Sequence, residues 1–143
     1  MIETSEVRKR VKLAIDKARR DAATHRAEAD AVSAHFDRLA QEVAGPLFRQ
    51  VASVLKAEGY PFQVFSPAGG LRLSSDRSGD DHLELALDAS RRPVALVLRS
   101  RQTRGHRVVD EERTLAEGPS VEGVSAEDLL AHLLDALAPF VER

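Results

Sequence analysis

Histidine and acidic residues are the side chains of this chain that could bind a metal ion or move a proton. Asp21 and His25 stand four positions apart, as do Asp128 and His132, so each pair would share one face of a helix. Two-residue sites of this kind arise often by chance and bind metals weakly, because zinc sites need three or four protein ligands. We therefore predict no metal site and no cofactor.

Other catalytic patterns are missing from the sequence. The chain contains no cysteine, which excludes disulfides, thiolate catalysis and cysteine-ligated zinc. It has neither a phosphate-binding Gly-Lys-Ser/Thr loop nor a dinucleotide-binding glycine motif. The acidic turn at Asp76, Asp80 and Asp81 lacks the ligand spacing of a calcium loop. We nominate no catalytic residue and expect a protein without enzyme activity.

Two groups of basic residues, within positions 8–20 and 91–107, could contact nucleic acid. The candidate phosphate contacts are Arg8, Arg10, Lys12, Arg19, Arg99, Arg101 and Arg107. Neither group contains Phe, Tyr or Trp for stacking on bases, and three acidic residues at 110–112 follow the second group closely. Because the formal net charge of the chain is also −2, nucleic-acid binding is the second hypothesis and not the first.

Apolar or small residues recur in alternating steps of four and three through the first third of the chain. These residues are Val11, Ile15, Ala18, Ala22, His25, Ala29, Val32, Phe36, Leu39 and Val43. This spacing averages 3.5 residues, which keeps one side of a helix facing a partner and is typical of a coiled coil. We predict a helix from Glu6 to Ala44, a kink or short break at Gly45-Pro46, and a second helix that ends at Gly59.

Beyond Gly59 the apolar residues alternate with a period of two, as in strands. Segments within 60–65, 71–74, 83–88, 93–98 and 106–115 are separated by polar turns, which predicts an antiparallel meander of four to five strands. Ser125 and Asp128 have capping-box spacing before a C-terminal helix with one wide apolar face. The predicted fold class is α+β, with both helices on one face of the sheet.

The expected lengths of these elements divide the chain into two parts. About 39 helical residues would extend nearly 60 Å, whereas a sheet of five strands is roughly 24 Å across. The larger apolar residues of the helix, such as Phe36 and Leu39, lie in its second half and should dock on the sheet. We therefore predict that residues 1–35 form a protruding, coiled-coil-like helix and that residues 36–143 form a single α+β domain.

The protruding helix is predicted to associate with a second copy of the chain. The self-association residues would be Val11, Ile15, Ala18, Ala22, His25 and Ala29. Lys12, Arg19 and Arg26 flank one side of this seam and Asp21 and Glu28 the other, which favours a parallel pair, although exposed ion pairs contribute only about 0.2–1 kcal/mol each. Because alanine surrounds this helix, a solvated or hairpin-packed helix is the alternative interpretation.

The remaining features concern location and partners. The charged N-terminus is unlike a signal peptide, and no apolar run approaches the roughly 20 residues that span a bilayer, so we expect a cytoplasmic protein without membrane contact. An apolar patch of Phe65, Ala86 and either Ala95 or Val97 could form a second contact surface on the open face of the sheet. The sequence thus predicts a small homodimeric adaptor or chaperone-like module that binds an unidentified protein.

Overall fold

The computed structural model describes residues 1–142 and confirms the α+β architecture. Helix α1 (Thr4–Leu39) continues through a π-helical turn (Ala40–Ala44) into helix α2 (Gly45–Ala57). The strands are β1 (Phe62–Phe65), β2 (Leu71–Ser75), β3 (His82–Asp88), β4 (Ala95–Arg104) and β5 (Arg107–Glu117). Two short 3-10 segments, Pro67–Gly69 and Gly118–Gly123, and helix α3 (Ala126–Val141) complete the fold.

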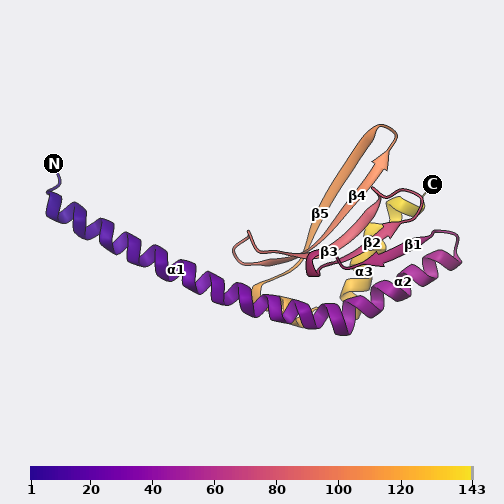
Figure 1. Ribbon diagram of the computed structural model, residues 1–143, viewed down its shortest axis with the longest axis horizontal. Coiled ribbons are helices and arrows are strands. Elements are labelled where there is room, and N and C mark those ends of the chain that lie inside the picture. Colours follow the sequence, from indigo (N-terminus) through magenta and orange to yellow (C-terminus); the bar gives the residue numbers. More distant parts are fainter. Residues whose placement is uncertain (143) are drawn as a thin grey trace.

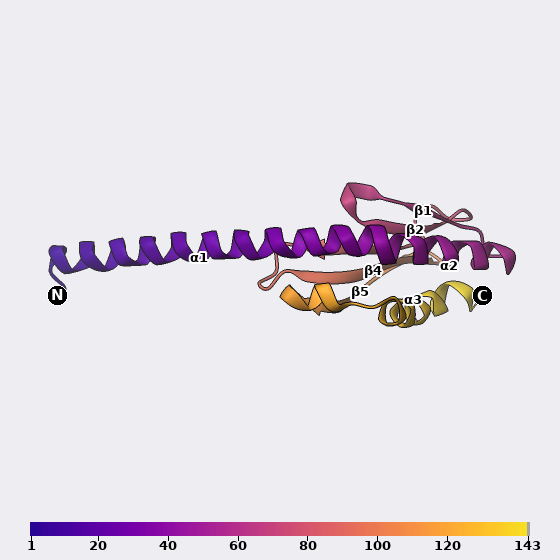
Figure 2. The ribbon, with the colours of Figure 1, turned by 90° about the horizontal axis from the view of Figure 1, so that it is seen from below.

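The N-terminal half of α1 extends away from a body that contains the sheet, α2 and α3 (Figure 1). The body's five strands form one antiparallel meander in the order β1-β2-β3-β4-β5. Strands β4 and β5 are the longest, and their hairpin projects beyond the other strands (Figure 1). The view from below shows α1 passing into α2 along the body, with α3 beside them (Figure 2).

One hydrophobic cluster joins the sheet to all three helices. Its strand residues come from one face of the sheet, because Leu73 faces Leu83 and Leu85 faces Leu98 in the strand register. The helices contribute buried residues to the same cluster, among them Val32, Phe36, Leu39, Phe48, Ala52, Leu129, Leu133, Leu137 and Phe140. The helices therefore pack on a single face of the sheet, as the sequence predicts. The capping box also forms, since the Asp128 amide donates to Ser125 Oγ at 3.1 Å.

The predicted kink is a π-helical turn that carries the chain from α1 into α2. The Gly45 amide donates to the carbonyl of Ala40, five residues earlier, and Pro46 has no amide hydrogen to donate. Gly45 is buried, and a Cβ atom added there would stand 2.7 Å from the Ala40 carbonyl oxygen. The wider turn therefore depends on glycine at this position as well as on proline at the next.

The open face of the sheet is charged, so the predicted apolar patch on it is wrong. Ala95 and Val97 are fully buried. Ion pairs cross this face between neighbouring strands: Arg72–Glu84 at 3.2 Å, Arg101–Asp110 at 3.0 Å and Arg99–Glu112 at 3.9 Å. Long charged side chains can cover small neighbours with their aliphatic stems, which explains why alternating apolar positions did not produce an exposed patch. Of the other two predicted residues, Phe65 is 49% exposed and Ala86 is half-buried.

We predict that Gly45→Ala lowers the free energy of unfolding by about 1–3 kcal/mol, because the new methyl group overlaps a backbone oxygen. In an ordinary helix the same change would stabilise the protein by up to about 1 kcal/mol, so the sign of the effect is diagnostic. Urea denaturation measures it. Gly79→Ala is the matched control, since a Cβ atom there meets nothing within 4 Å. Equal stability of the two variants would contradict the role given to Gly45.

Candidate functional site

The candidate site is an uncovered apolar strip on the N-terminal half of α1, which we call the open stripe: Thr4, Val7, Val11, Ile15 and Ala18. Val7, Val11 and Ile15 are 43%, 51% and 46% exposed. Together with Thr4, Arg8 and Lys12 they line a shallow groove along the helix. Among the described residues, no other element lies over this part of α1 (Figures 1 and 2).

The open stripe continues the face of α1 that the body buries. At about 100° per residue, Val7, Val11 and Ile15 all lie within about 60° of Phe36 around the helix axis. Phe36 is 5% exposed and belongs to the core. Apart from His25, one side of the helix is therefore apolar or small from Val7 to Leu39, and the body covers only the C-terminal half of that side. Leu13, which points the other way and is 60% exposed, shows that an isolated apolar residue on α1 can also face solvent.

The structure divides the six predicted self-association residues into two groups. Val11, Ile15 and Ala18 are exposed on the open stripe, whereas Ala22 and His25 are half-buried. Ala29 packs against the core of its own chain. Ala22, His25 and Ala29 are therefore partly covered by the body. The surface that remains free for a partner lies nearer the N-terminus than the sequence pattern predicted.

Val7 belongs to the open stripe although the strict 4-3 spacing omits it. A straight α-helix has 3.6 residues per turn, so it drifts by about 20° for every seven residues against a 3.5-residue pattern. That drift brings position 7 onto the face marked by Val11 and Ala18. A search at 100° per residue, in place of a heptad pattern, would have found Val7 from the sequence.

Charged residues border the open stripe and support the helix locally. The side chain of Arg10 contacts Glu6 at 3.1 Å, and Lys17 contacts Asp21 at 2.8 Å, both with the four-residue spacing that favours a helix. The Lys17 hydrogen bond and charge lower the pKa of Asp21, and the positive charge of Arg92 contributes to the shift. The turn between β3 and β4, which carries Arg92, therefore lies close to α1 at the level of Asp21.

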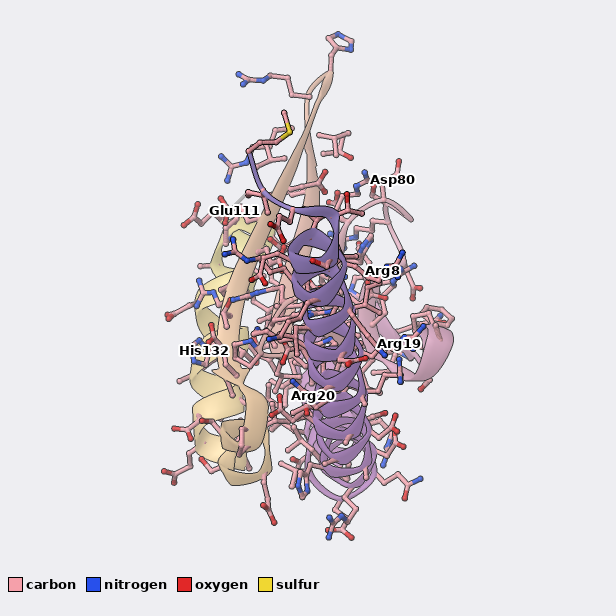
Figure 3. The ribbon with its side chains drawn as sticks, turned by 90° about the vertical axis from the view of Figure 1, so that its left-hand side faces the viewer. Arg8, Arg19, Arg20, Asp80, Glu111 and His132 are labelled. Carbon is pink, nitrogen blue, oxygen red and sulfur yellow. The ribbon has the colours of Figure 1, made fainter. Side chains whose placement is uncertain are left out.

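The residues proposed for nucleic-acid contact do not form one surface. Arg99 and Arg101 lie on the sheet within ion pairs, and Arg10 pairs with Glu6 on α1. Arg107 stands at the start of β5, next to the tip of the β4–β5 hairpin. Figure 3 looks toward the N-terminal end of α1 and shows Arg8 and Arg19 on that helix, with the hairpin rising away from it. The two basic groups therefore lie on different parts of the molecule, and acidic neighbours balance the charges of Arg99 and Arg101.

Within residues 1–142, no three histidine or acidic side chains lie close enough together to hold a metal ion. None of the helices in the same residues has the length and apolar character needed to cross a bilayer. Comparison of the chain with models of protein families, with curated proteins and with solved structures found no match. The open stripe is thus identified as a candidate site only from the exposure and helix positions of its residues.

A polar cluster on the open face of the sheet contains His82. This residue faces Arg101 across the β3–β4 pair, and its Nδ1 atom is buried without a hydrogen-bond partner. Burial lowers the pKa of His82 from the ordinary value of 6.5, and the nearby charges of Arg72 and Arg101 lower it further, against the opposite effect of Glu84 and Asp110. The folded protein therefore favours neutral His82.

We predict that the free energy of unfolding decreases as the pH falls below 6.5, because His82 takes up a proton more readily in the unfolded chain. Well above pH 6.5 the histidine is neutral in both the folded and the unfolded state, so it contributes no pH dependence there. His82→Gln should flatten the pH dependence measured by urea unfolding between pH 8 and pH 5. His106→Gln, at the exposed hairpin tip, is the control and should leave the slope unchanged. The interpretation is wrong if both variants retain the parental slope.

Proposed function

We propose that this protein is a cytoplasmic homodimeric adaptor or chaperone-like module that binds another protein and has no catalytic activity of its own. The observation that carries the proposal is the open stripe, where Val7, Val11 and Ile15 stand about half exposed on one side of a helix. A contiguous apolar strip bordered by charged residues is typical of a protein contact site. The homodimer would form through this strip, and the bodies would carry the surfaces for the protein partner.

Helix stability supports the need for a partner on the open stripe. Residues 4–18 belong neither to the hydrophobic core nor to the residues packed against it, and this part of α1 extends away from the body (Figure 2). An isolated helix of about 15 residues is only marginally stable in water. Burial of the exposed parts of Val7, Val11 and Ile15 would stabilise the helix at about 25 cal/mol per Å² of apolar surface. In a symmetric dimer each of these residues would bury apolar surface in both copies. Pairing therefore accounts both for the length of α1 and for its one-sided composition.

The body offers surfaces on which a protein partner could bind. Val108, near the tip of the projecting hairpin, and Phe65, on the edge strand β1, are both about half exposed. A dimer would present each surface twice, and simultaneous engagement of two copies strengthens binding without any new kind of contact. This arrangement suits an adaptor better than an enzyme, since it separates the self-association helix from the partner-binding body.

We predict that Ile15→Glu weakens the homodimer by at least tenfold, since the charge would be buried twice in a symmetric interface. Leu13→Glu is the matched control, because Leu13 is 60% exposed on the opposite side of the same helix. Sedimentation equilibrium over a concentration series measures the dissociation constant, and the thermal midpoint of the body should be similar in both variants. The proposal fails if the parental chain is monomeric at all concentrations or if Leu13→Glu has the larger effect.

Nucleic-acid binding remains the second candidate function because of one feature of α1. Arg8, Lys12 and Arg19 are exposed and, within residues 1–142, form no ion pair, so their positive charge is available to a polyanion. The ion-paired state of Arg99 and Arg101 and the absence of nearby aromatic side chains favour the adaptor. A polyanion held by α1 alone would make few phosphate contacts and so bind weakly.

We predict that the protein elutes from a DNA or heparin column at low salt. The combined variant Arg8→Gln, Lys12→Gln, Arg19→Gln should elute with little change. A nucleic-acid-binding protein would instead show retention that falls steeply with salt, roughly in proportion to the number of phosphates contacted, and would lose it in the triple variant. Arg107→Gln tests the hairpin group separately under the same conditions.

A further inference from the structure

We infer that the open stripe is occupied by the same stripe of a second copy running antiparallel, so that the two bodies lie at opposite ends of a paired helix. This inference rests on the proposed self-association and specifies its geometry. It starts from the position of the body, which lies on one side of α1 (Figure 1). The open stripe lies on that same side, because Val7, Val11 and Ile15 are within about 60° of the buried Phe36 around the helix axis.

The body excludes a parallel, in-register pair. Two packed helices have axes 8–10 Å apart, so a parallel partner would continue along the stripe past residue 25 at that distance. The same space is filled by the sheet and the Gly118–Gly123 segment, which bury Val32, Phe36 and Leu39. Helix α1 has no break before Ala40 that would let two helices diverge earlier. The partner helix must therefore end where the body begins, which only the reversed direction permits.

The open stripe has a self-complementary register in the antiparallel direction. Its uncovered length runs from Thr4 to the half-buried Ala22, and the centre of that interval is residue 13. A two-fold axis at this level places Val11 of one copy beside Ile15 of the other, and repeats this contact by symmetry. At the ends, the small side chain of Ala18 accommodates the stem of Arg8, and Ala22 lies beside Thr4. Val11 and Ile15 therefore meet at the centre, Val7 lies level with Arg19 of the other copy, and Ala18 and Ala22 lie toward the margins.

Charged residues beside the open stripe weakly oppose the antiparallel pair, whereas charges at the N-terminal end of the helix favour it. The axis brings the two Lys12 residues near each other, at a cost of a few tenths of a kcal/mol, about the size of an exposed ion pair. At the ends, Glu3 and Glu6 of one copy come level with residues 20–23 of the other. There Arg92 acts on Asp21 and offers positive charge from the β3–β4 turn. The steric exclusion by the body outweighs the flank charges, which taken alone favour the parallel direction.

The absence of cysteine from the chain allows a clean crosslinking test. Val11→Cys and Ile15→Cys are prepared separately, and each is oxidised alone and in an equal mixture. A disulfide needs Cα atoms about 4.4–6.8 Å apart. In the inferred register the mixture forms an interchain disulfide in high yield and each variant alone does not, because identical residues are offset by about 6 Å along the helix axis as well as across it. Leu13→Cys, on the opposite side, is the control and should not crosslink.

The outcomes separate this inference from the proposed function. Efficient crosslinking of each variant with itself would show a parallel pair and overturn the inference, while the homodimer would stand. A dimer in sedimentation equilibrium that shows no preference for the mixture would also overturn it, since the interface would then lie elsewhere. A parental chain that stays monomeric over the whole concentration series would instead overturn the self-association on which the inference rests.

Discussion

The apolar side of α1 is longer than the body that covers it, and the rest of the structure depends on this mismatch. Burial of apolar surface is the main favourable contribution to folding. A helix face that begins in the core and continues into solvent is therefore stabilised if a partner buries its exposed part as well. Val32, Phe36 and Leu39 obtain that cover from the Gly118–Gly123 segment and the sheet of the same chain. Val7, Val11 and Ile15 do not, and this difference distinguishes the interaction surface from the core.

The π-helical turn sets the end of α1 and the direction in which α2 continues from it. Pro46 cannot donate a backbone hydrogen bond, and Gly45 allows the close approach of the Ala40 carbonyl oxygen. The change of direction lets α2 place Phe48 in the same core that Phe36 enters from α1. A straight continuation would carry α2 past the sheet, so a local backbone feature determines how much of the long helix the body can use.

The open face of the sheet shows how charge can replace a covering layer. Arginine and acidic side chains on β2, β3, β4 and β5 pair across neighbouring strands over small buried residues. Each exposed pair contributes little energy, but long charged side chains can cover small neighbours with their aliphatic stems, and Ala95 and Val97 on this face are fully buried. This face therefore needs no protein layer, in contrast with the open stripe. Within residues 1–142, the open stripe is thus an extended apolar strip without cover from the same chain, and it is the basis for the proposed adaptor function.

The sequence by itself determined the order of the elements, the meander, the kink at Gly45-Pro46 and the capping box at Ser125, because all of these follow from local periodicity and backbone chemistry. It underestimated the length of β4, since residues 99–104 are polar and are held as a strand by pairing with β5. Only the tertiary structure decided which stretch of the long apolar face is free. Ala22, His25 and Ala29 match the same repeat as Val11 and Ile15, and no local feature of the sequence distinguishes the two sets. The body, which is built from residues far along the chain, partly covers Ala22, His25 and Ala29 but does not reach Val11 and Ile15.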